Sequence, residues 1–414
     1  MSIQQLCQCA RDSTQQLSYT THEAKKSALL AMADQLMADT DKILAANQQD
    51  IAAGKQNGLS TAMLDRLLLN LDRIAAMANG IRDIAQLDDP TQRVLAQWTR
   101  PNGLTIQRVS VPIGVIGVIY ESRPNVTADA AALCIQSGNA VILRGGSESF
   151  HSNQAIAQSI KTALASSTLP SDCVQILSNP DRALIDQLIV QTDLVDVIIP
   201  RGGPRLINYL MEHSKIPLFK HLQGLCHTYV HQSADVDMAA NICVNAKMRR
   251  TGICGATETI LIDRAAQSTH LPVIIKALQA QHCEILGDQS VCALFDDIIP
   301  ATESDWHTEY LDAIISIRLV DDINQAIDHI RQYSSNHTDA IIAEDSQAVT
   351  QFFNQVDSAI VMHNASTQFA DGGEFGMGAE IGIATGKLHA RGPVGVEQLT
   401  TFKYIVKGNG QTRP

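Results

Sequence analysis

Apolar residues recur three and four positions apart through the first part of the chain. The clearest runs are LLAMADQLMADTDKILAANQQDI and AMLDRLLLNLDRIAAMANGIRDIAQL. This spacing gathers apolar side chains on one face of a helix. We therefore expect residues 1 to about 88 to form a helical lead-in.

The pattern changes after Thr99, where apolar and polar positions begin to alternate. LTIQRVSVP is typical of a half-exposed strand that ends at Pro112, and the C-terminal run TTFKYIVKG is a strand that could pair with it. The run IGVIGVIY, at 113–120, is instead apolar at every position. That pattern is typical of a strand buried inside a parallel sheet.

From residue 113 onward, strand and helix patterns alternate. One series runs through AVILR, VQIL and VDVIIP, and a second runs from CHTYVH through ETILID and AIISIRLV to SAIVMH. Alternation of this kind predicts doubly wound parallel sheets, whose ligand-binding loops lie at the carboxyl ends of the strands. We expect two α/β domains in series.

Length and composition agree with a two-domain protein. The 414 residues exceed the roughly 250 to 300 at which a single core stops growing. The sequence has no apolar run long enough for a transmembrane helix and no basic segment followed by an apolar core at the N-terminus. Nine cysteines without framework spacing indicate free thiols in a reducing compartment, and no Cys/His group has the spacing of a zinc site. We expect a cytoplasmic, metal-free protein.

The formal net charge of -12 argues against nucleic acid or an anionic membrane as a partner, since both require a basic face. An anionic substrate must therefore find a local basic pocket. For any single basic residue, however, a solvated surface charge is the commoner role. The candidates in Gly-rich or Pro-containing stretches are Arg123, Arg144, Arg201, Lys247, Arg249, Arg250, Lys387 and Arg391.

Cys254 lies between a doubly basic segment and an apolar run. Gly252 and Gly255 leave the backbone free to approach a ligand, and the charges of Arg249 and Arg250 would favour a thiolate. These features fit a nucleophile. The alternative is a small buried cysteine without chemistry, because free cysteines are commonly buried and inert.

Two Gly-rich turns, Gly145-Gly146 and Gly202-Gly203, follow predicted strands. Neither matches the GxGxxG fingerprint, so a standard dinucleotide site is not supported. The turns still suggest phosphate recognition, although tight βα turns use glycine for conformational reasons about as often. His329 and His337 lie in a helical pattern and the turn after it, where structural roles are more common.

Together these motifs resemble the gamma-glutamyl phosphate reductases of the aldehyde dehydrogenase superfamily. The resemblance is carried by VPIGVIGVIYESRPNVTADAAALCIQSGNAVILRGGSES, CHTYV, the Cys254 segment, residues 320–341 and DGGEFGMGAEIGIATGKLHARGPVGVEQL. It implies an aldehyde dehydrogenase-like α/β fold with two doubly wound parallel-sheet domains and a small β oligomerisation flap. The domains expected are 1–102, a helical lead-in and the start of the cofactor-binding domain; 103–112, an oligomerisation strand; 113–232, the NADP-binding domain; 233–365, the catalytic domain with Cys254; 366–392, a return to the cofactor-binding domain; and 393–414, a second oligomerisation strand.

The resemblance also implies roles for single residues. Cys254 corresponds to the nucleophile, and Asn125 corresponds to the oxyanion donor that acts beside the Cys254 backbone NH. Ser147 stands where many relatives carry a Glu near the adenosine ribose, which favours NADPH over NADH, although Ser147 could instead cap the following helix. The full cofactor set is Arg144, Ser147, Gly202, Gly203 and Glu309, and the cationic partners for the substrate are Arg123, Arg201, Arg250 and Arg391.

One departure from the aldehyde-oxidising members bears on the reaction. They carry a Glu as general base for water attack on the thioester, whereas this chain has His221-Leu-Gln-Gly-Leu-Cys226. A thioester that exchanges with phosphate does not need that base. The implied reaction is NADPH-dependent reduction of L-glutamyl 5-phosphate to L-glutamate 5-semialdehyde and phosphate through a Cys254 thioester, a step of proline biosynthesis. Gly255 also departs from the Asn of many relatives.

The resemblance further implies a homo-oligomer joined through the flap, and it allows a transient contact with glutamate 5-kinase. Two alternatives stay open. One is an aldehyde-oxidising NAD(P) dehydrogenase of the same fold, which the missing Glu disfavours. The other is a catalytically silent scaffold, which would not need the set of Cys254, Asn125 and Glu309.

Overall fold

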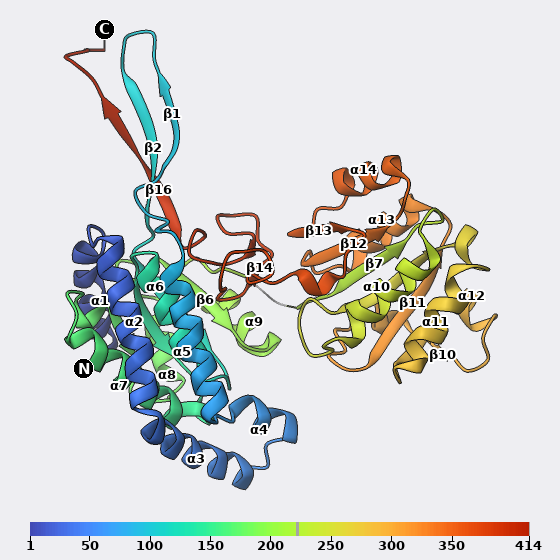
Figure 1. Ribbon diagram of the computed structural model, residues 1–414, viewed down its shortest axis with the longest axis horizontal. Coiled ribbons are helices and arrows are strands. Elements are labelled where there is room, and N and C mark those ends of the chain that lie inside the picture. Colours follow the sequence, from blue (N-terminus) through green and yellow to red (C-terminus); the bar gives the residue numbers. More distant parts are fainter. Residues whose placement is uncertain (221–222, 414) are drawn as a thin grey trace. The chain divides into compact units, whose positions relative to one another are not determined.

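The computed structural model describes residues 1–220 and 223–413, and they form two compact units. The first unit comprises residues 1–220, 376–382 and 394–413, and the second comprises residues 223–375 and 383–393. Figure 1 traces the chain through both units. Each unit has its own parallel sheet and is described by itself.

The N-terminal segment is helical, as the spacing of its apolar residues predicts. Its helices are α1 (Ile3–Leu17), α2 (His22–Ala38), α3 (Thr40–Gln56), α4 (Thr61–Leu67) and α5 (Leu71–Gln86). Polar side chains cap several of the helices at their N-termini, such as Thr21 at α2 and Asn70 at α5. Helix α1 packs on the first sheet, so these helices belong to the same core as the strands that follow.

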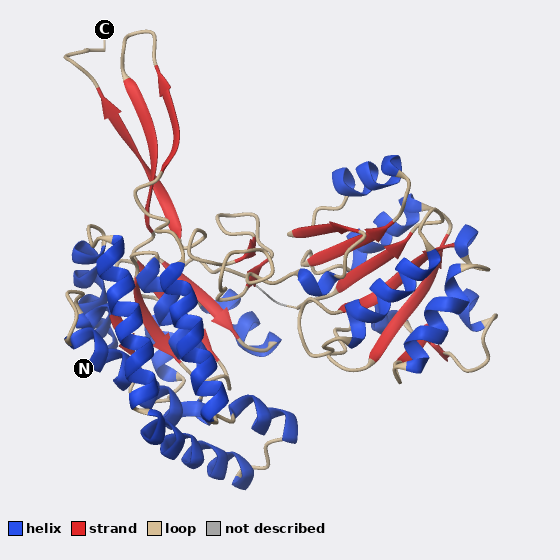
Figure 2. Cartoon of the chain, in the orientation of Figure 1, coloured by secondary structure: helices blue, strands red, loops and turns tan. Residues whose placement is uncertain are grey.

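The sheet of the first unit has the order β5-β4-β3-β6, and all of its strands are parallel. Its strands are β3 (Val115–Tyr120), β4 (Ala140–Arg144), β5 (Val174–Ile176) and β6 (Val197–Arg201). Its helical connections are α6 (Asn125–Gln136), η1 (Ser147–Ser149), α7 (Phe150–Ala165), η2 (Ser171–Cys173) and α8 (Ala183–Leu188), and α9 (Pro204–His213) follows β6. Figure 2 shows helices flanking this sheet. Residues 121, 145 and 202 therefore all follow carboxyl ends of neighbouring strands.

A three-stranded antiparallel sheet, here called the flap, projects from the rest of the first unit (Figure 1). It consists of β1 (Val94–Thr99), β2 (Thr105–Pro112) and β16 (Thr400–Lys407). The pairing of β2 with β16 confirms the sequence prediction. Strand β1 was missed, although the Asn102-Gly103 turn that joins it to β2 is a hairpin signal.

The sheet of the second unit has the order β10-β9-β11-β8-β7-β12-β13, and all of its strands are parallel. Its strands are β7 (Cys226–Val230), β8 (Thr257–Asp263), β9 (Glu284–Gly287), β10 (Ile299–Pro300), β11 (Ile314–Val320), β12 (Thr338–Ile342) and β13 (Ile360–His363). The helices between them are α10 (Val236–Met248), η3 (Arg264–Ala266), α11 (His270–Ala280), α12 (Gln289–Cys292), η4 (Glu303–His307), α13 (Ile323–Tyr333) and α14 (Ser346–Gln355), and η5 (Thr367–Phe369) follows β13. A small antiparallel pair, β14 (Ile383–Ala384) and β15 (Gly392–Pro393), completes the unit.

Two of the predicted domain boundaries are wrong. Strand β7, assigned by the sequence to the first domain, lies between β8 and β12 in the second sheet, because its fully buried residues pair on both sides. Residues 366–375 and 383–392 also belong to the second unit rather than returning to the first. Ile383 packs with Ala340 and Ile360 of the second sheet, which explains that placement.

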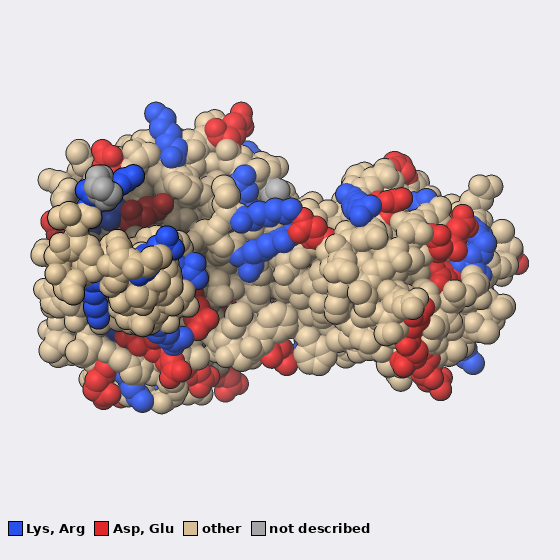
Figure 3. All heavy atoms as spheres, turned by 90° about the horizontal axis from the view of Figure 1, so that it is seen from above, with Lys and Arg blue, Asp and Glu red and all other residues tan. Residues whose placement is uncertain are grey.

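Charges are mixed on the surface. On the face drawn in Figure 3, Lys and Arg are interspersed with Asp and Glu and do not form one broad basic area. This agrees with the net charge of -12. In the part of the chain that the structure describes, no helix is long and apolar enough to cross a membrane.

Candidate active site

Cys254 lies in the second unit, on the turn between α10 and β8. It is half-buried and packs against an apolar cluster that includes Ala340, Met362 and Ala370. The turn precedes β8, so it stands at the amino ends of the parallel strands. Cys254 therefore does not lie at the carboxyl ends of the strands, where ligand-binding loops are generally expected.

The backbone of the Cys254 turn is held by close contacts. The Cys226 thiol donates a hydrogen bond to the Cys254 carbonyl oxygen at 3.1 Å. A Cβ added to Gly224 would lie 1.9 Å from that same oxygen, and one added to Gly255 would lie 3.0 Å from the Thr367 carbonyl oxygen. Space therefore requires glycine at position 224. At Gly255 the contact is tight, and a side chain there would require the Thr367 carbonyl to shift by a few tenths of an ångström.

Gln368, which the sequence did not point to, also holds the turn. Its side-chain amide donates to the carbonyl oxygens of Ala246 at 2.9 Å and Arg250 at 3.2 Å. Arg249 donates to the Gln368 carbonyl oxygen at 3.3 Å. Buried Gln368 therefore ties the end of α10 to the segment before Cys254.

Six of the other cysteines are more deeply buried than Cys254. Burial raises the pKa of the thiols of Cys7, Cys134, Cys173, Cys226, Cys243 and Cys283 above the ordinary value. Those thiols stay protonated at neutral pH and are shielded from solutes, so they are poor nucleophiles. The remaining cysteines, Cys9, Cys254 and Cys292, are half-buried, and only Cys254 is flanked by glycines.

Glu309 contacts the same segment as Cys254. Its carboxylate accepts a hydrogen bond from the Gly224 backbone NH at 2.9 Å. Burial raises the pKa of Glu309, while the Gly224 NH and the Lys247 charge oppose that rise. The structure therefore brings two of the predicted residues, Cys254 and Glu309, into contact with Gly224.

Behind the turn lies a buried ion pair between Lys247 of α10 and Glu258 of β8. Their side chains are 0% and 2% exposed. The Lys247 ammonium also lies 5.7 Å from the centre of the Tyr310 ring. Burial raises the pKa of Glu258 to about 7, and the Lys247 charge opposes the rise. The pair joins the two elements that flank Cys254.

Asn125 lies in the first unit, as the first residue of α6. Its side-chain amide donates to Asp129 Oδ2 at 2.9 Å, one helical turn later. The sequence gave no signal for Asp129, because an acidic residue within an Ala-rich helix usually faces solvent. Here it fixes the direction of the predicted oxyanion donor.

Arg144 is the last residue of β4, and Ser147 begins η1 three positions later. Buried Arg144 donates to the Pro180 carbonyl oxygen at 2.8 Å, and burial lowers the pKa of its guanidinium. Ser147 is exposed and begins η1, and it makes no capping hydrogen bond with its side chain. Helix α7 has Ser149 at its N-cap. The helix-cap alternative for Ser147 therefore finds no support in the geometry.

The Gly202-Gly203 turn is not an open phosphate cradle. The Glu121 carboxylate accepts a hydrogen bond from the Gly203 NH at 2.8 Å. A Cβ added to Gly202 would lie 2.7 Å from that carboxylate. Because a negative charge already occupies the turn, the geometry does not favour a phosphate there, and the glycines serve close packing.

The four arginines considered for the substrate differ in their surroundings. Arg391 forms an ion pair with Asp357 at 2.8 Å, so its charge is already engaged. Arg250 is exposed beside the Cys254 turn, and Arg123 is exposed in the turn before α6. Arg201, at the end of β6, is half-buried.

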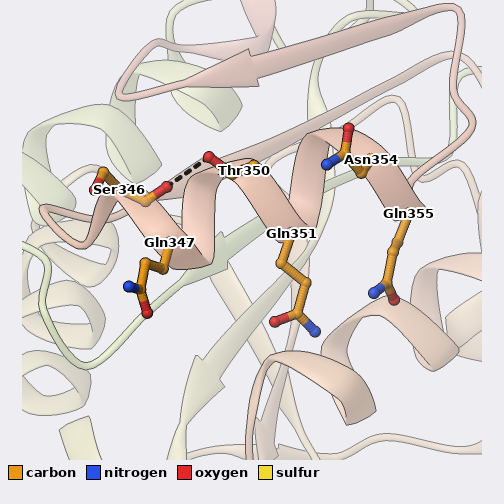
Figure 4. A pocket seen from close by; sticks show the side chains of 6 residues that line it. All are labelled: Ser346, Gln347, Thr350, Gln351, Asn354 and Gln355. Carbon is orange, nitrogen blue, oxygen red and sulfur yellow. Dashed lines mark hydrogen bonds between the residues drawn. The ribbon is translucent and has the colours of Figure 1, made fainter.

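Within residues 1–220 and 223–413, no group of three or more His, Cys, Asp or Glu side chains could hold a metal ion. A surface hollow along α14 is lined by uncharged polar side chains (Figure 4). The Thr350 hydroxyl donates to the Ser346 carbonyl oxygen at 2.8 Å, as Figure 4 shows. This hollow holds no titratable group and suggests no chemistry.

Comparison with known proteins places these features in a family. The model of the aldehyde dehydrogenase family matches residues 1–288. The gamma-glutamyl phosphate reductase of Paramagnetospirillum magneticum is 59% identical over 409 residues, covering 99% of this chain and 97% of that protein. That of Rhodospirillum rubrum is 58% identical over 405 residues, covering 98% and 95%. The chain belongs to the gamma-glutamyl phosphate reductase family.

A solved structure from this family supports the fold. The crystal structure of the gamma-glutamyl phosphate reductase of Thermotoga maritima is similar to this chain with a TM-score of 0.98 and 39% identity, covering 100% of both chains. An acetylating aldehyde dehydrogenase of Geobacillus thermoglucosidasius shares the fold at 16% identity, with a TM-score of 0.71 and coverage of 100% and 97%. The resemblance drawn from the sequence motifs and the expected aldehyde dehydrogenase-like fold are confirmed.

Proposed function

We propose that the chain reduces L-glutamyl 5-phosphate to L-glutamate 5-semialdehyde and phosphate, with NADPH as the reductant, in proline biosynthesis. The observation that carries this proposal is the 59% identity, over 99% of the chain, to a gamma-glutamyl phosphate reductase. The half-buried Cys254 on its tightly packed turn supports it, because that residue could supply the nucleophile.

In the proposed mechanism, the Cys254 thiolate attacks the acyl carbon of the substrate. The oxyanion that forms accepts hydrogen bonds from Asn125 and from the Cys254 backbone NH. The carbon–oxygen bond to phosphate breaks, and a Cys254 thioester remains. Hydride addition to that thioester carbon gives a thiohemiacetal, whose collapse releases the semialdehyde and returns the thiolate.

The residues at the end of β4 fit NADPH. Bound NADPH supplies the hydride. The exposed Ser147 carries no charge that would repel a 2'-phosphate, and Arg144 could donate charge-assisted hydrogen bonds to it. Glu309 would hold the nicotinamide ribose through its carboxylate, one oxygen of which accepts from the Gly224 NH.

Exchange of the thioester with phosphate rather than water rests on residues 223–226, which carry no carboxylate. His221 and Leu222 of the same stretch lie outside the described residues. Glu309 is bonded to this segment through one oxygen, which accepts from the Gly224 NH. The Glu of the aldehyde-oxidising members is missing from this stretch, which disfavours the aldehyde-oxidising alternative.

The decisive experiment is oxidation of glutamate 5-semialdehyde with NADP, with and without inorganic phosphate. The proposal predicts NADPH formation that depends on phosphate and a coupled release of acyl phosphate. Equal rates without phosphate would establish the aldehyde-oxidising alternative. No turnover in either buffer would favour the silent scaffold.

We also propose that the flap joins copies of this chain, in the cytoplasm. Its exposed side chains include Trp98, Phe402 and Tyr404, and an isolated narrow sheet is marginally stable in water. Deleting residues 399–414, or changing Trp98→Ser with Tyr404→Ser, should convert an oligomer to monomers in light scattering. An intact protein that is already monomeric would end this proposal.

A further inference from the structure

Asp129 carries an oxygen without a hydrogen bond. Helix α6 places its side chain beside Asn125, whose amide donates to Oδ2 at 2.9 Å. The other oxygen, Oδ1, faces Gly80 of α5, where an added Cβ would still be 3.9 Å away. Within the described residues, Oδ1 accepts no hydrogen bond, so half of this half-buried carboxylate is available to a ligand.

Arg201 supplies the opposite charge nearby. It ends β6, and its charge acts on the Asp129 carboxyl. Its guanidinium lies against the backbone of Gly382, where an added Cβ would be 2.7 Å from a guanidinium nitrogen. Even so, among residues 1–220 and 223–413 it forms neither an ion pair nor a side-chain hydrogen bond.

The Arg201 charge acts on Asp129, yet the two side chains form no ion pair. Arg391 pairs with Asp357, and Arg11 pairs with Asp196 at 2.9 Å. A half-buried guanidinium and carboxylate that stay apart leave room for a ligand that carries both complementary charges. The end of an α-amino acid is such a ligand, since one carbon carries its ammonium and its carboxylate.

We propose that Asp129 binds the α-ammonium and Arg201 the α-carboxylate of the substrate, so that together they select its amino-acid end. This inference rests on the proposed function, in which the substrate is a glutamyl phosphate. Three carbon–carbon bonds of about 1.5 Å separate its acyl carbon from its α-carbon. Side chains four apart on a helix are roughly 5–6 Å apart at Cβ, so Asn125 could meet the acyl oxygen while Asp129 meets the ammonium.

A simpler role for Asp129 is to position Asn125 alone. Substrates that lack one charged group separate the two roles. Glutarate semialdehyde has no ammonium, and 4-aminobutanal has no carboxylate. The wild type should prefer glutamate 5-semialdehyde over both in the phosphate-dependent oxidation.

Asp129→Asn keeps a side-chain oxygen that can accept from Asn125, and it should lower kcat/KM about 10- to 100-fold more for glutamate 5-semialdehyde than for glutarate semialdehyde, the value of one charge-assisted hydrogen bond. Arg201→Gln should lower kcat/KM for both substrates that carry a carboxylate and leave 4-aminobutanal unchanged. Asn125→Ala is the matched control, because it should slow all three substrates alike, about 100- to 1,000-fold.

Equal losses on all substrates for Asp129→Asn would show that it only positions Asn125, and a wild type without preference for the ammonium would overturn the proposal. If Asp129→Asn folds poorly, Asp129→Ser and calorimetric binding of L-glutamate against glutarate give the same comparison without turnover. A wild type that oxidises none of the three aldehydes would count against the proposed function itself. In that case, equal binding of L-glutamate and glutarate would also reject the ammonium site.

Discussion

Near the candidate chemistry, two charged side chains of the first unit keep polar atoms without a hydrogen bond, whereas the charged side chains around the Cys254 turn are paired. In the second unit, Lys247 is bonded to Glu258, and Glu309 to the Gly224 NH. In the first unit, the Arg201 guanidinium and Asp129 Oδ1 have no hydrogen-bond partner within the part of the chain that the structure describes. Both sets lie next to residues with proposed catalytic roles. They differ in that the groups of the second unit are bonded to the protein itself, whereas those of the first unit still lack a partner.

The difference teaches that one unit is organised before a ligand arrives and the other is completed by it. A buried ion pair adds little net stability compared with apolar residues, because both charges lose their hydration. We infer that the ion pair between Lys247 and Glu258 holds α10 and β8 in a fixed position relative to each other. The open charges of the first unit would instead serve recognition.

The largest effect should come from Cys254, the reacting group of the organised unit. Cys254→Ala should abolish reduction and leave the melting temperature close to that of the wild type, because the side chain is only half-buried. Cys292→Ala is the matched control, since Cys292 is also half-buried but lies on α12. Turnover assays with both variants, and alkylation by iodoacetamide, would check this. Substantial activity in Cys254→Ala would remove it as the nucleophile.

The pairing itself can be broken at Lys247. Lys247→Met should lower the free energy of unfolding by about 3–5 kcal/mol, because buried Glu258 is left without its partner. Adding Glu258→Leu should restore most of that loss. Arg201→Gln, in the open set, should change stability by about 0.5 kcal/mol or less. Urea unfolding of the four proteins measures this, and equal losses for Lys247→Met and Arg201→Gln would erase the contrast between the units.

Cofactor choice tests a second open group, the Ser147 hydroxyl. Ser147→Glu should raise KM for NADPH much more than KM for NADH, since a carboxylate repels the 2'-phosphate and accepts hydrogen bonds from a 2'-hydroxyl. Ser147→Gln adds the same bulk without the charge and should have a smaller effect. Steady-state kinetics with both cofactors decide it, and an unchanged cofactor ratio in Ser147→Glu would place selectivity elsewhere.

The smallest effect concerns pH. Burial raises the pKa of Asp129 to about 6, while the Asn125 hydrogen bond and the Arg201 charge oppose that rise. Ammonium binding needs the ionised form, so KM for glutamate 5-semialdehyde should rise several-fold as pH falls through about 6. KM for glutarate semialdehyde, which has no ammonium group, should not rise over the same pH range.

The same pKa gives a readout in stability. Because the pKa of Asp129 is raised in the folded protein, that state holds the proton between about pH 4 and pH 6 while the unfolded chain has lost it. The free energy of unfolding should therefore fall as pH rises across this window, and Asp129→Asn should lack that component. Identical pH profiles for the two proteins would contradict the assignment.

Much of the fold could be predicted because its strands are apolar on both faces and its helices have regular apolar spacing. The domain boundary near β7 could not be predicted. A buried strand has the same apolar pattern in either sheet, and the pairing of β7 with β8 depends on the folded structure. Strand β1 was missed because its residues are mostly exposed and no core selects their pattern.

The candidate site was predictable where chemistry leaves a local mark. Glycines on both sides mark Cys254, and a turn after a strand marks Ser147. Partners distant in sequence leave no such mark, as with Gln368, which reaches back to Ala246, and Glu121, which occupies the Gly203 NH. Asp129 could be recognised as a candidate site residue only from the structure, in which the Arg201 charge acts on it.

Gly224 has a mechanical consequence. Its NH donates to Glu309, and the carbonyl oxygen of Cys254 fills the space where a Cβ would stand, so one residue links the carboxylate proposed for the ribose to the backbone of the proposed nucleophile. If a bound cofactor drew Glu309 away, the segment packed against Cys254 would lose that hydrogen bond. The rate at which an alkylating reagent modifies the Cys254 thiol would then report whether NADPH is bound. This measurement needs no substrate.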